Sequence, residues 1–124
     1  MLKETDSHFI CFGEIYFSLV NVGVVKAWKF HERITTNYAC ISGCVKFVLY
    51  DDRSSSPTKG ALIEVALGPD NYALLVVPPR IWNVFQGISD DTAIVANCAT
   101  EPDYRSEIQR LDPEDRLVPY NWAT

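Results

Sequence analysis

The sequence has no long apolar run. Its longest apolar stretches, such as Ala73–Pro79, are far shorter than the roughly 20 residues with which a helix crosses a bilayer. Residues 1–6 include the acidic Glu4 and Asp6, and they lack the basic start and apolar segment of a signal peptide. We therefore expect a cytoplasmic protein that has no membrane as a partner.

Positive charge is in short supply. The chain of 124 residues has 11 Lys and Arg against 16 Asp and Glu, which gives a net charge of -5. Proteins that bind nucleic acids or anionic membranes need a positive field to attract phosphate groups. The composition therefore argues against both classes of partner, although it leaves room for a local basic pocket.

Metal-binding and redox motifs are absent as well. The chain has only 2 histidines, and its 4 cysteines (Cys11, Cys40, Cys44 and Cys98) show no CxxC spacing and no paired histidines nearby. On one straight strand Cys40 and Cys44 would lie about 13 Å apart, which is too far for a disulfide, and only a turn at Ser42-Gly43 would bring them closer. We expect buried thiols, no bound metal and no cofactor.

Short β-strands dominate what the sequence does contain. Hydrophobic residues make up 48% of the chain, and they gather in segments rich in β-branched and aromatic residues between turn formers. These segments predict eight strands: Glu14–Val20, Val24–Phe30, Thr36–Ile41, Cys44–Tyr50, Ala61–Leu67, Ala73–Val77, Trp82–Gln86 and Thr92–Cys98. Such a series is typical of an all-β sandwich or barrel, and closing it into a jelly roll removes exposed strand edges.

Helix signals are thin. Only Tyr104–Leu111 has any helical pattern, and Pro113 ends it after barely two turns, so we expect a short helix or an irregular C-terminal tail. The polar stretch Asp51–Lys59 is long enough for one hairpin loop only. Because no repeat or linker divides the chain, we expect residues 1–124 to form a single domain.

Three segments, in this order, resemble the dTDP-4-dehydrorhamnose 3,5-epimerase family. Gly23–His31 is similar to the family stretch in which a basic, a small and an apolar residue precede the catalytic histidine. Ser42–Gly60 resembles the family's strand, Asp-x-Arg turn and Ser-Pro-Thr-x-Gly loop, and Val77–Phe85 resembles its Pro-Pro-Gly-x-x-His-Gly-Phe signature. Thr100–Pro102 and Val118–Trp122 are similar to its C-terminal segment.

The resemblance implies a cupin-type double-stranded β-helix, usually a homodimer, with a dTDP-linked nucleotide sugar in the barrel mouth. In the family a histidine helped by an aspartate removes the proton beside the 4-keto group, a lysine stabilises the enolate, and a tyrosine returns a proton. The histidine, lysine and tyrosine positions correspond here to Lys29, to Thr36 or a neighbour, and to Ala96, and the aspartate falls near Asn121. The match begins close to residue 12, whereas family members carry an additional N-terminal strand.

Because the base, the lysine and the tyrosine are not retained, the resemblance leaves open whether the protein is an enzyme. We expect a nucleotide-sugar-binding protein without the family's usual 3,5-epimerase activity. One alternative is an active deoxysugar epimerase or ketoisomerase that uses His31 with Lys29. The other is a non-enzymatic interaction protein whose oligomer surface matters more than its pocket.

The candidate site residues begin with the basic segment around Lys29. An extended strand would place Lys29, His31 and Arg33 on one face and Lys26 on the other. The first face is either the solvated side of an edge strand or, in the family's register, a cationic lining of the barrel mouth suited to a sugar diphosphate. We take His31 and Lys29 as candidate catalytic residues, and Lys26 and Arg33 as candidate substrate-binding residues. The other interpretation of His31 is a hydrogen-bonded structural group.

Three further residues are candidate substrate contacts. Arg53 suits either a phosphate contact or local hydrogen bonds that stabilise its loop. Trp82 and Asn83 place an aromatic ring beside an amide, which suits stacking on a base or sugar, although tryptophan is also a common core residue. A metal-binding cupin needs a His-x-His pair and a later histidine, and Lys29, His31 and Asn83 do not supply that set.

Overall fold

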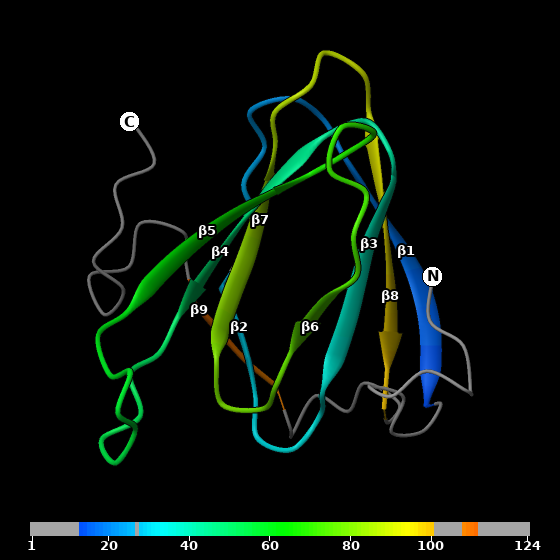
Figure 1. The fold of residues 1–124 in the computed structure, drawn as a ribbon. Helices are drawn as coiled ribbons and strands as arrows, with labels where there is room; N and C mark the ends of the chain where they lie inside the picture. The colour runs from blue at the N-terminus through cyan, green and yellow to red at the C-terminus, as the bar shows by residue number, and fades with distance from the viewer. Residues whose placement is uncertain (1–12, 27, 101–107, 112–124) are drawn as a thin grey trace.

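The computed structural model describes residues 13–26, 28–100 and 108–111, which form two antiparallel β-sheets (Figure 1). The described residues contain nine strands and no helix, so none of their elements is a helix long and apolar enough to cross a membrane. Sheet A has the order β1 (Glu14–Val20), β8 (Ala93–Ala99), β3 (Thr36–Ser42) and β6 (Leu75–Val77). Sheet B has the order β5 (Leu62–Leu67), β4 (Val45–Tyr50), β7 (Trp82–Gly87), β2 (Trp28–His31) and β9 (Ile108–Leu111).

All eight strands predicted from the sequence are present, and most of their ends agree to within two residues. The exception is the second one, which we expected from Val24 and which begins only at Trp28. The chain before it makes the isolated bridge Val25–Gln86 instead of a continuous ladder. The β-branched and aromatic residues, with the turn formers between them, therefore located the strands.

The prediction for the C-terminal segment was wrong for Ile108–Leu111. These residues form strand β9, which pairs antiparallel with β2 from Trp28–Leu111 to His31–Ile108. The pairing gives β2 a neighbour on its second edge, and Leu111 packs against the cluster around Trp28. Pairing with β2 thus outweighs the weak helical pattern of this segment. The rest of the predicted helix, residues 104–107, lies outside the described residues.

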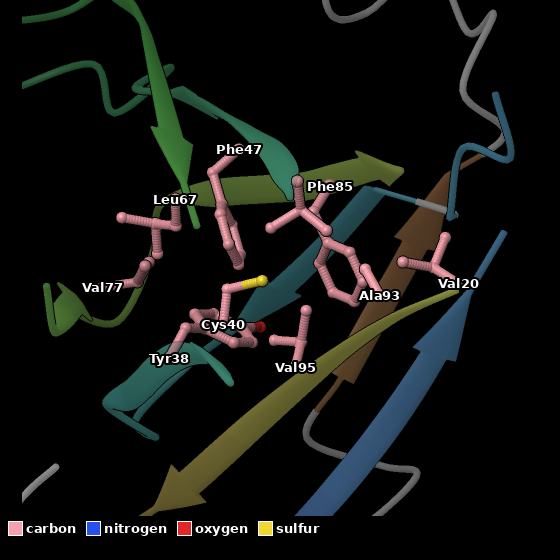
Figure 2. Packing of buried hydrophobic residues seen from close by; sticks show 10 residues of the cluster. Val20, Tyr38, Cys40, Phe47, Leu67, Val77, Phe85, Ala93 and Val95 are labelled. Atoms are coloured by element: carbon pink, nitrogen blue, oxygen red, sulfur yellow. The ribbon is translucent and has the colours of Figure 1, made fainter. Parts of the chain in front are cut away.

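The main hydrophobic core lies between the two sheets and is shown in Figure 2. Its centre is aromatic: the rings of Tyr38 and Phe47 lie 4.9 Å apart, and those of Phe47 and Phe85 lie 5.1 Å apart. Both distances fall in the range of favourable aromatic pairs. The side of each sheet that carries these residues is called the inner face below. The fully or largely buried members of the core are Val20, Tyr38, Cys40, Val45, Phe47, Leu67, Val77, Phe85, Ala93 and Val95.

A second cluster covers the outer face of sheet B. It contains Trp28, Val48, Trp82 and Val84. These residues alternate along their strands with inner-face residues, as Val84 does with Phe85. Sheet B is therefore apolar on both faces in this region, which is typical of a strand layer covered on both sides.

The chain makes a tight turn at Ser42-Gly43. Such a turn was the only predicted way to bring Cys40 and Cys44 close to each other. Gly43 has φ 71°, and a Cβ there would lie 2.8 Å from the Cα of Ala93, so this position needs glycine. Even so, Cys40 and Cys44 are free thiols, as is Cys98. Burial raises the pKa of the Cys40 and Cys98 thiols, which keeps them protonated.

Candidate functional site

Two facing rows of residues form the polar end of the barrel interior. On sheet A, Tyr16 of β1 pairs with Asn97 of β8, which pairs in turn with Tyr38 of β3. On sheet B, Lys29 of β2 pairs with Asn83 of β7. Paired residues on neighbouring strands point to the same side of a sheet, and Tyr38 belongs to the core between the sheets. Both rows therefore face the interior.

Side-chain contacts join these rows to each other. The Tyr38 hydroxyl donates a hydrogen bond of 2.9 Å to Asn83 Oδ1. The Lys29 Nζ atom lies 5.8 Å from the centroid of the Tyr16 ring, within the range of a cation–π contact. Within sheet A, Asn97 Nδ2 donates a hydrogen bond of 2.8 Å to the Tyr16 hydroxyl oxygen. A hydrogen bond of 3.4 Å from Asn83 Nδ2 to the Lys29 carbonyl links the two groups. We call this polar set the Tyr16–Lys29 cluster; its members are Tyr16, Lys29, Tyr38, Asn83 and Asn97.

The two amides of this cluster are almost fully buried, with Asn83 2% and Asn97 1% exposed. Within the described part of the chain, nothing donates a hydrogen bond to Asn97 Oδ1, and Thr36 Oγ1 is also buried without a partner. A buried polar atom that lacks a partner costs about 1–3 kcal/mol. Such atoms are suited to contacts with the hydroxyl groups of a sugar.

An apolar cavity of about 210 Å³ adjoins the cluster. Its walls include Leu49, which pairs with Asn83, and Ile81, whose carbonyl accepts a hydrogen bond of 3.4 Å from Asn83 Nδ2. Asp51 and Thr58 also line it. Ligand pockets for drug-sized molecules usually have about 300–1,000 Å³, so this cavity is smaller than a typical ligand pocket.

Of the residues selected from the sequence, three share the inner face of sheet B. Lys29 and Asn83 are strand partners, and His31 lies two residues beyond Lys29 on the same face. His31 is only 5% exposed, and its carbonyl accepts a hydrogen bond of 2.7 Å from the Arg80 amide. The interpretation of this strand as the solvated side of an edge is therefore wrong for His31.

Arg53 makes local hydrogen bonds within its loop, which was one of the two roles predicted for it. Its Nε and Nη2 atoms each donate a hydrogen bond of 2.9 Å to the carboxylate of Asp51. The hydroxyls of Ser56 and Thr58 donate to the same carboxylate. The Arg53 guanidinium, with these hydroxyls, holds the pKa of the Asp51 carboxyl well below its usual range. Together these four residues form what we call the Asp51 clasp.

The remaining selected residues do not converge with Asn83. Trp82 belongs to the outer cluster of sheet B, where its ring lies 5.0 Å from that of Phe30 and its Nε1 donates a hydrogen bond of 3.1 Å to Asp52. Lys26 Nζ donates to the Leu19 carbonyl at 3.2 Å. Arg33 is exposed and follows β2.

Sequence reasoning missed Tyr16 and Asn97. Both lie on strands that were predicted, but they are 81 residues apart, and nothing in the sequence indicated that β1 pairs with β8. The position taken for the family's tyrosine, Ala96, precedes Asn97 on β8 and therefore points to the outer face. Among the described residues, no group of three or more potential metal ligands is present.

The model of the family described as dTDP-4-dehydrorhamnose 3,5-epimerase matches residues 8–122. The chain belongs to this family. A dTDP sugar isomerase from Desulfovibrio desulfuricans, known from its crystal structure, is 45% identical, with a TM-score of 0.97 over 99% of this chain and 79% of that chain. The epimerase from Elizabethkingia anophelis has a TM-score of 0.80 at 20% identity and shares the fold. The predicted all-β cupin double-stranded β-helix is confirmed.

Two relatives show the length of other family members. The probable low-salt glycan biosynthesis epimerase Agl13 of Haloferax volcanii is 33% identical over 86% of this chain and 65% of its own length. The spore coat polysaccharide biosynthesis protein SpsL of Bacillus subtilis is 29% identical over 100% of this chain and 83% of its own length. The chain thus spans a little less than two thirds of the Haloferax relative.

Proposed function

We propose that this protein binds a dTDP-linked nucleotide sugar inside the barrel and lacks the family's usual 3,5-epimerase activity. The observation that carries the proposal is the shared inner face of Lys29, His31 and Asn83, beside the apolar cavity. Lys29 supplies a positive charge for the diphosphate, while the buried amides offer hydrogen bonds to sugar hydroxyls.

The missing family residues support the second half of the proposal. Lys29 stands at the position of the catalytic histidine, and a lysine side chain acts as a base only as the neutral amine, which forms at neutral pH only when its pKa is strongly lowered. Thr36 and Ala96, which stand in for the enolate-stabilising lysine and the tyrosine, carry neither a charge nor an acidic hydroxyl. The usual double inversion therefore lacks its groups.

Thermal unfolding tests nucleotide-sugar binding. A ligand present at 100 times its dissociation constant adds about 2.7 kcal/mol to the stability of the folded state, so dTDP-glucose should raise the melting temperature by several degrees. UDP-glucose and inorganic pyrophosphate serve as comparisons for the base and the phosphate groups. The proposal fails if no nucleotide sugar changes the melting temperature.

A second candidate function is an active epimerase or ketoisomerase that uses His31 with Lys29. The position of the two side chains on one face, across from a phenol, favours it. Incubation of a 4-keto sugar nucleotide in D₂O should then place deuterium next to the keto group, and the rate should fall in His31→Ala. The absence of exchange at high protein concentration argues for binding alone.

We also propose that the protein is a homodimer that associates through the outer face of sheet A. On β1 this face exposes Phe17 to 59% and Leu19 to 62%, and Ile15 and Ile41 are also exposed. Exposed apolar patches of this kind are typical of interaction sites. A pocket filled by side chains such as Trp82 would favour the non-enzymatic alternative, but Trp82 lies on the outer face of sheet B.

A further inference from the structure

Arg80 has a strained backbone conformation in the turn before β7. Its φ is 67°, and the other described residues with a positive φ are all glycines, namely Gly23, Gly43 and Gly60. A β-carbon makes this conformation unfavourable, whereas glycine adopts it without cost. The family signature has glycine at this position. This chain therefore carries a long side chain where the backbone favours none.

The structural contacts of Arg80 do not account for its side chain. Its amide donates a hydrogen bond of 2.7 Å to the carbonyl of His31, and glycine would make the same bond. Among the described residues, the guanidinium has one polar partner, Glu32 at 3.7 Å, and both side chains are more than half exposed. An exposed pair of this length contributes too little to offset the strain. Backbone strain that stability does not explain is typical of functional sites.

Arg80 lies at the rim of the candidate site. Its backbone is bonded to His31, which is two residues beyond Lys29 on β2 and shares its face. Pro78 and Ile81, on either side of Arg80 along the chain, line the apolar cavity. The turn between β6 and β7 and the end of β2 lie together at the bottom of Figure 1. Arg80 is thus placed between the cavity and the basic strand.

The charges at this rim favour an anion. Lys29 supplies a positive charge on the inner face of β2, and the exposed Arg33 follows the strand. The guanidinium of Arg80 presents N–H donors in one plane, which fit two oxygens of a phosphate group. Because its pair with Glu32 is long and exposed, an anionic ligand needs to displace only a weak contact.

We propose that Arg80 is a ligand-binding residue whose guanidinium leaves Glu32 and binds the diphosphate of the nucleotide sugar at the rim of the barrel. This proposal rests on nucleotide-sugar binding in the barrel and adds a contact that is particular to this chain, because the family signature has glycine there. The strained conformation is retained because the side chain serves binding and not stability. Glu32 then acts as an internal competitor of the diphosphate.

A double-mutant cycle of Arg80→Gly and Glu32→Gln tests the proposal through the affinity for dTDP-glucose, measured by isothermal titration. Arg80→Gly should bind about 10-fold more weakly or worse, because a charge-assisted contact is lost. Glu32→Gln should bind at least about 2-fold more tightly, because the competing carboxylate is gone. In the Arg80→Gly background, Glu32→Gln should leave the affinity unchanged. Lys46→Met, which removes a positive charge from the outer face of β4, is the control and should bind like the wild type.

A second ligand, dTDP, identifies the group that Arg80 contacts. Arg80→Gly should weaken dTDP and dTDP-glucose by the same factor, since both carry the diphosphate. A loss confined to dTDP-glucose would place the contact on the sugar and overturn the assignment. The melting temperature of Arg80→Gly, which should not fall below that of the wild type, shows that a loss of affinity does not come from unfolding.

The remaining outcomes separate this proposal from the function on which it rests. Equal affinity of the wild type and Arg80→Gly overturns the role of Arg80 and leaves nucleotide-sugar binding standing. An equal effect of Glu32→Gln with and without Arg80 overturns the competition between Glu32 and the ligand, because the carboxylate then acts without Arg80. No binding of either ligand by the wild type removes the proposed function itself.

Discussion

The ammonium group of Lys29 on β2 lies 5.8 Å from the ring centroid of Tyr16 on β1, across the gap between the two sheets. This contact places a positive charge inside a chain whose net charge is -5. A cation over an aromatic face contributes about 0.5–2 kcal/mol, with the larger values where water is excluded. The contact therefore stabilises a cationic interior that a diphosphate or an enolate can use.

Tyr38→Phe should lower the free energy of unfolding by about 1–2 kcal/mol. The variant keeps the aromatic core contacts with Phe47 but leaves Asn83 Oδ1 without the donor that now lies 2.9 Å away. Urea unfolding measures the change. Tyr50→Phe, on the outer side of β4, is the control, and a loss of equal size there would show that the buried hydrogen bond is not the cause.

The Asp51 clasp should make stability fall with pH in acid. Because the pKa of the Asp51 carboxyl is lowered in the folded protein, its contribution is present above about pH 4, the value of the unfolded chain, and is lost as the pH drops below it. Asp51→Asn should cost about 2 kcal/mol at pH 7 and should flatten the decrease between pH 5 and pH 3. Urea midpoints across this range measure it. Asp90→Asn, at an exposed turn, should keep the wild-type slope, and a wild-type slope in Asp51→Asn would contradict the role of the clasp.

Arg80→Gly should stabilise the fold. Arg80 has φ 67°, a left-handed conformation that costs a residue with a Cβ about 1–2 kcal/mol, and the family signature has glycine here. Its ion pair with Glu32 is long, at 3.7 Å, and exposed, so its loss costs little. We expect the free energy of unfolding, measured by heat or urea, to rise by about 1 kcal/mol. Arg80→Ala, which loses the same ion pair but keeps a Cβ, should show no such rise. A rise of the same size in Arg80→Ala would show that removal of the charge, and not of the strain, is the cause.

The proposed dimer should depend on Phe17. Phe17→Asp puts a charge into the exposed apolar face of β1 and should convert the dimer to a monomer in light scattering coupled to size-exclusion chromatography. Tyr72→Asp changes a residue of similar exposure on a loop and should leave the dimer intact. A wild-type protein that is monomeric at all concentrations contradicts the proposal.

The sequence was sufficient to predict half of the candidate site. Alternation along one strand predicted that Lys29 and His31 share a face, and the family register offered the barrel mouth as one of two environments for that face. In the structure both residues lie on the inner face of sheet B, where Lys29 pairs with Asn83. Ile108–Leu111 was mistaken for a helix or tail because four residues carry too little pattern, and their strand exists only as a partner of β2.

The other half of the site depends on pairings between distant strands. Tyr16 and Asn97 meet because β1 and β8 are neighbours in sheet A, a relationship that no local pattern encodes. Trp82 was selected as a site residue although it lies outside the site. The motif places it next to Asn83, but successive residues of a strand face opposite sides of the sheet. Only the position of the core decides which of the two sides is the interior.

The most direct test of the account is the affinity for dTDP-glucose of the wild type, Lys29→Met and Lys46→Met, measured by isothermal titration. Both substitutions remove one positive charge. Lys29 lies on the inner face of sheet B, whereas Lys46 lies between two core residues on β4 and therefore points to the outer face. A charge-assisted contact contributes about 1.5–3 kcal/mol, so Lys29→Met should bind roughly 10–100-fold more weakly while Lys46→Met binds like the wild type. Equal affinity in all three proteins, or no binding by the wild type, would contradict the placement of the ligand in the barrel.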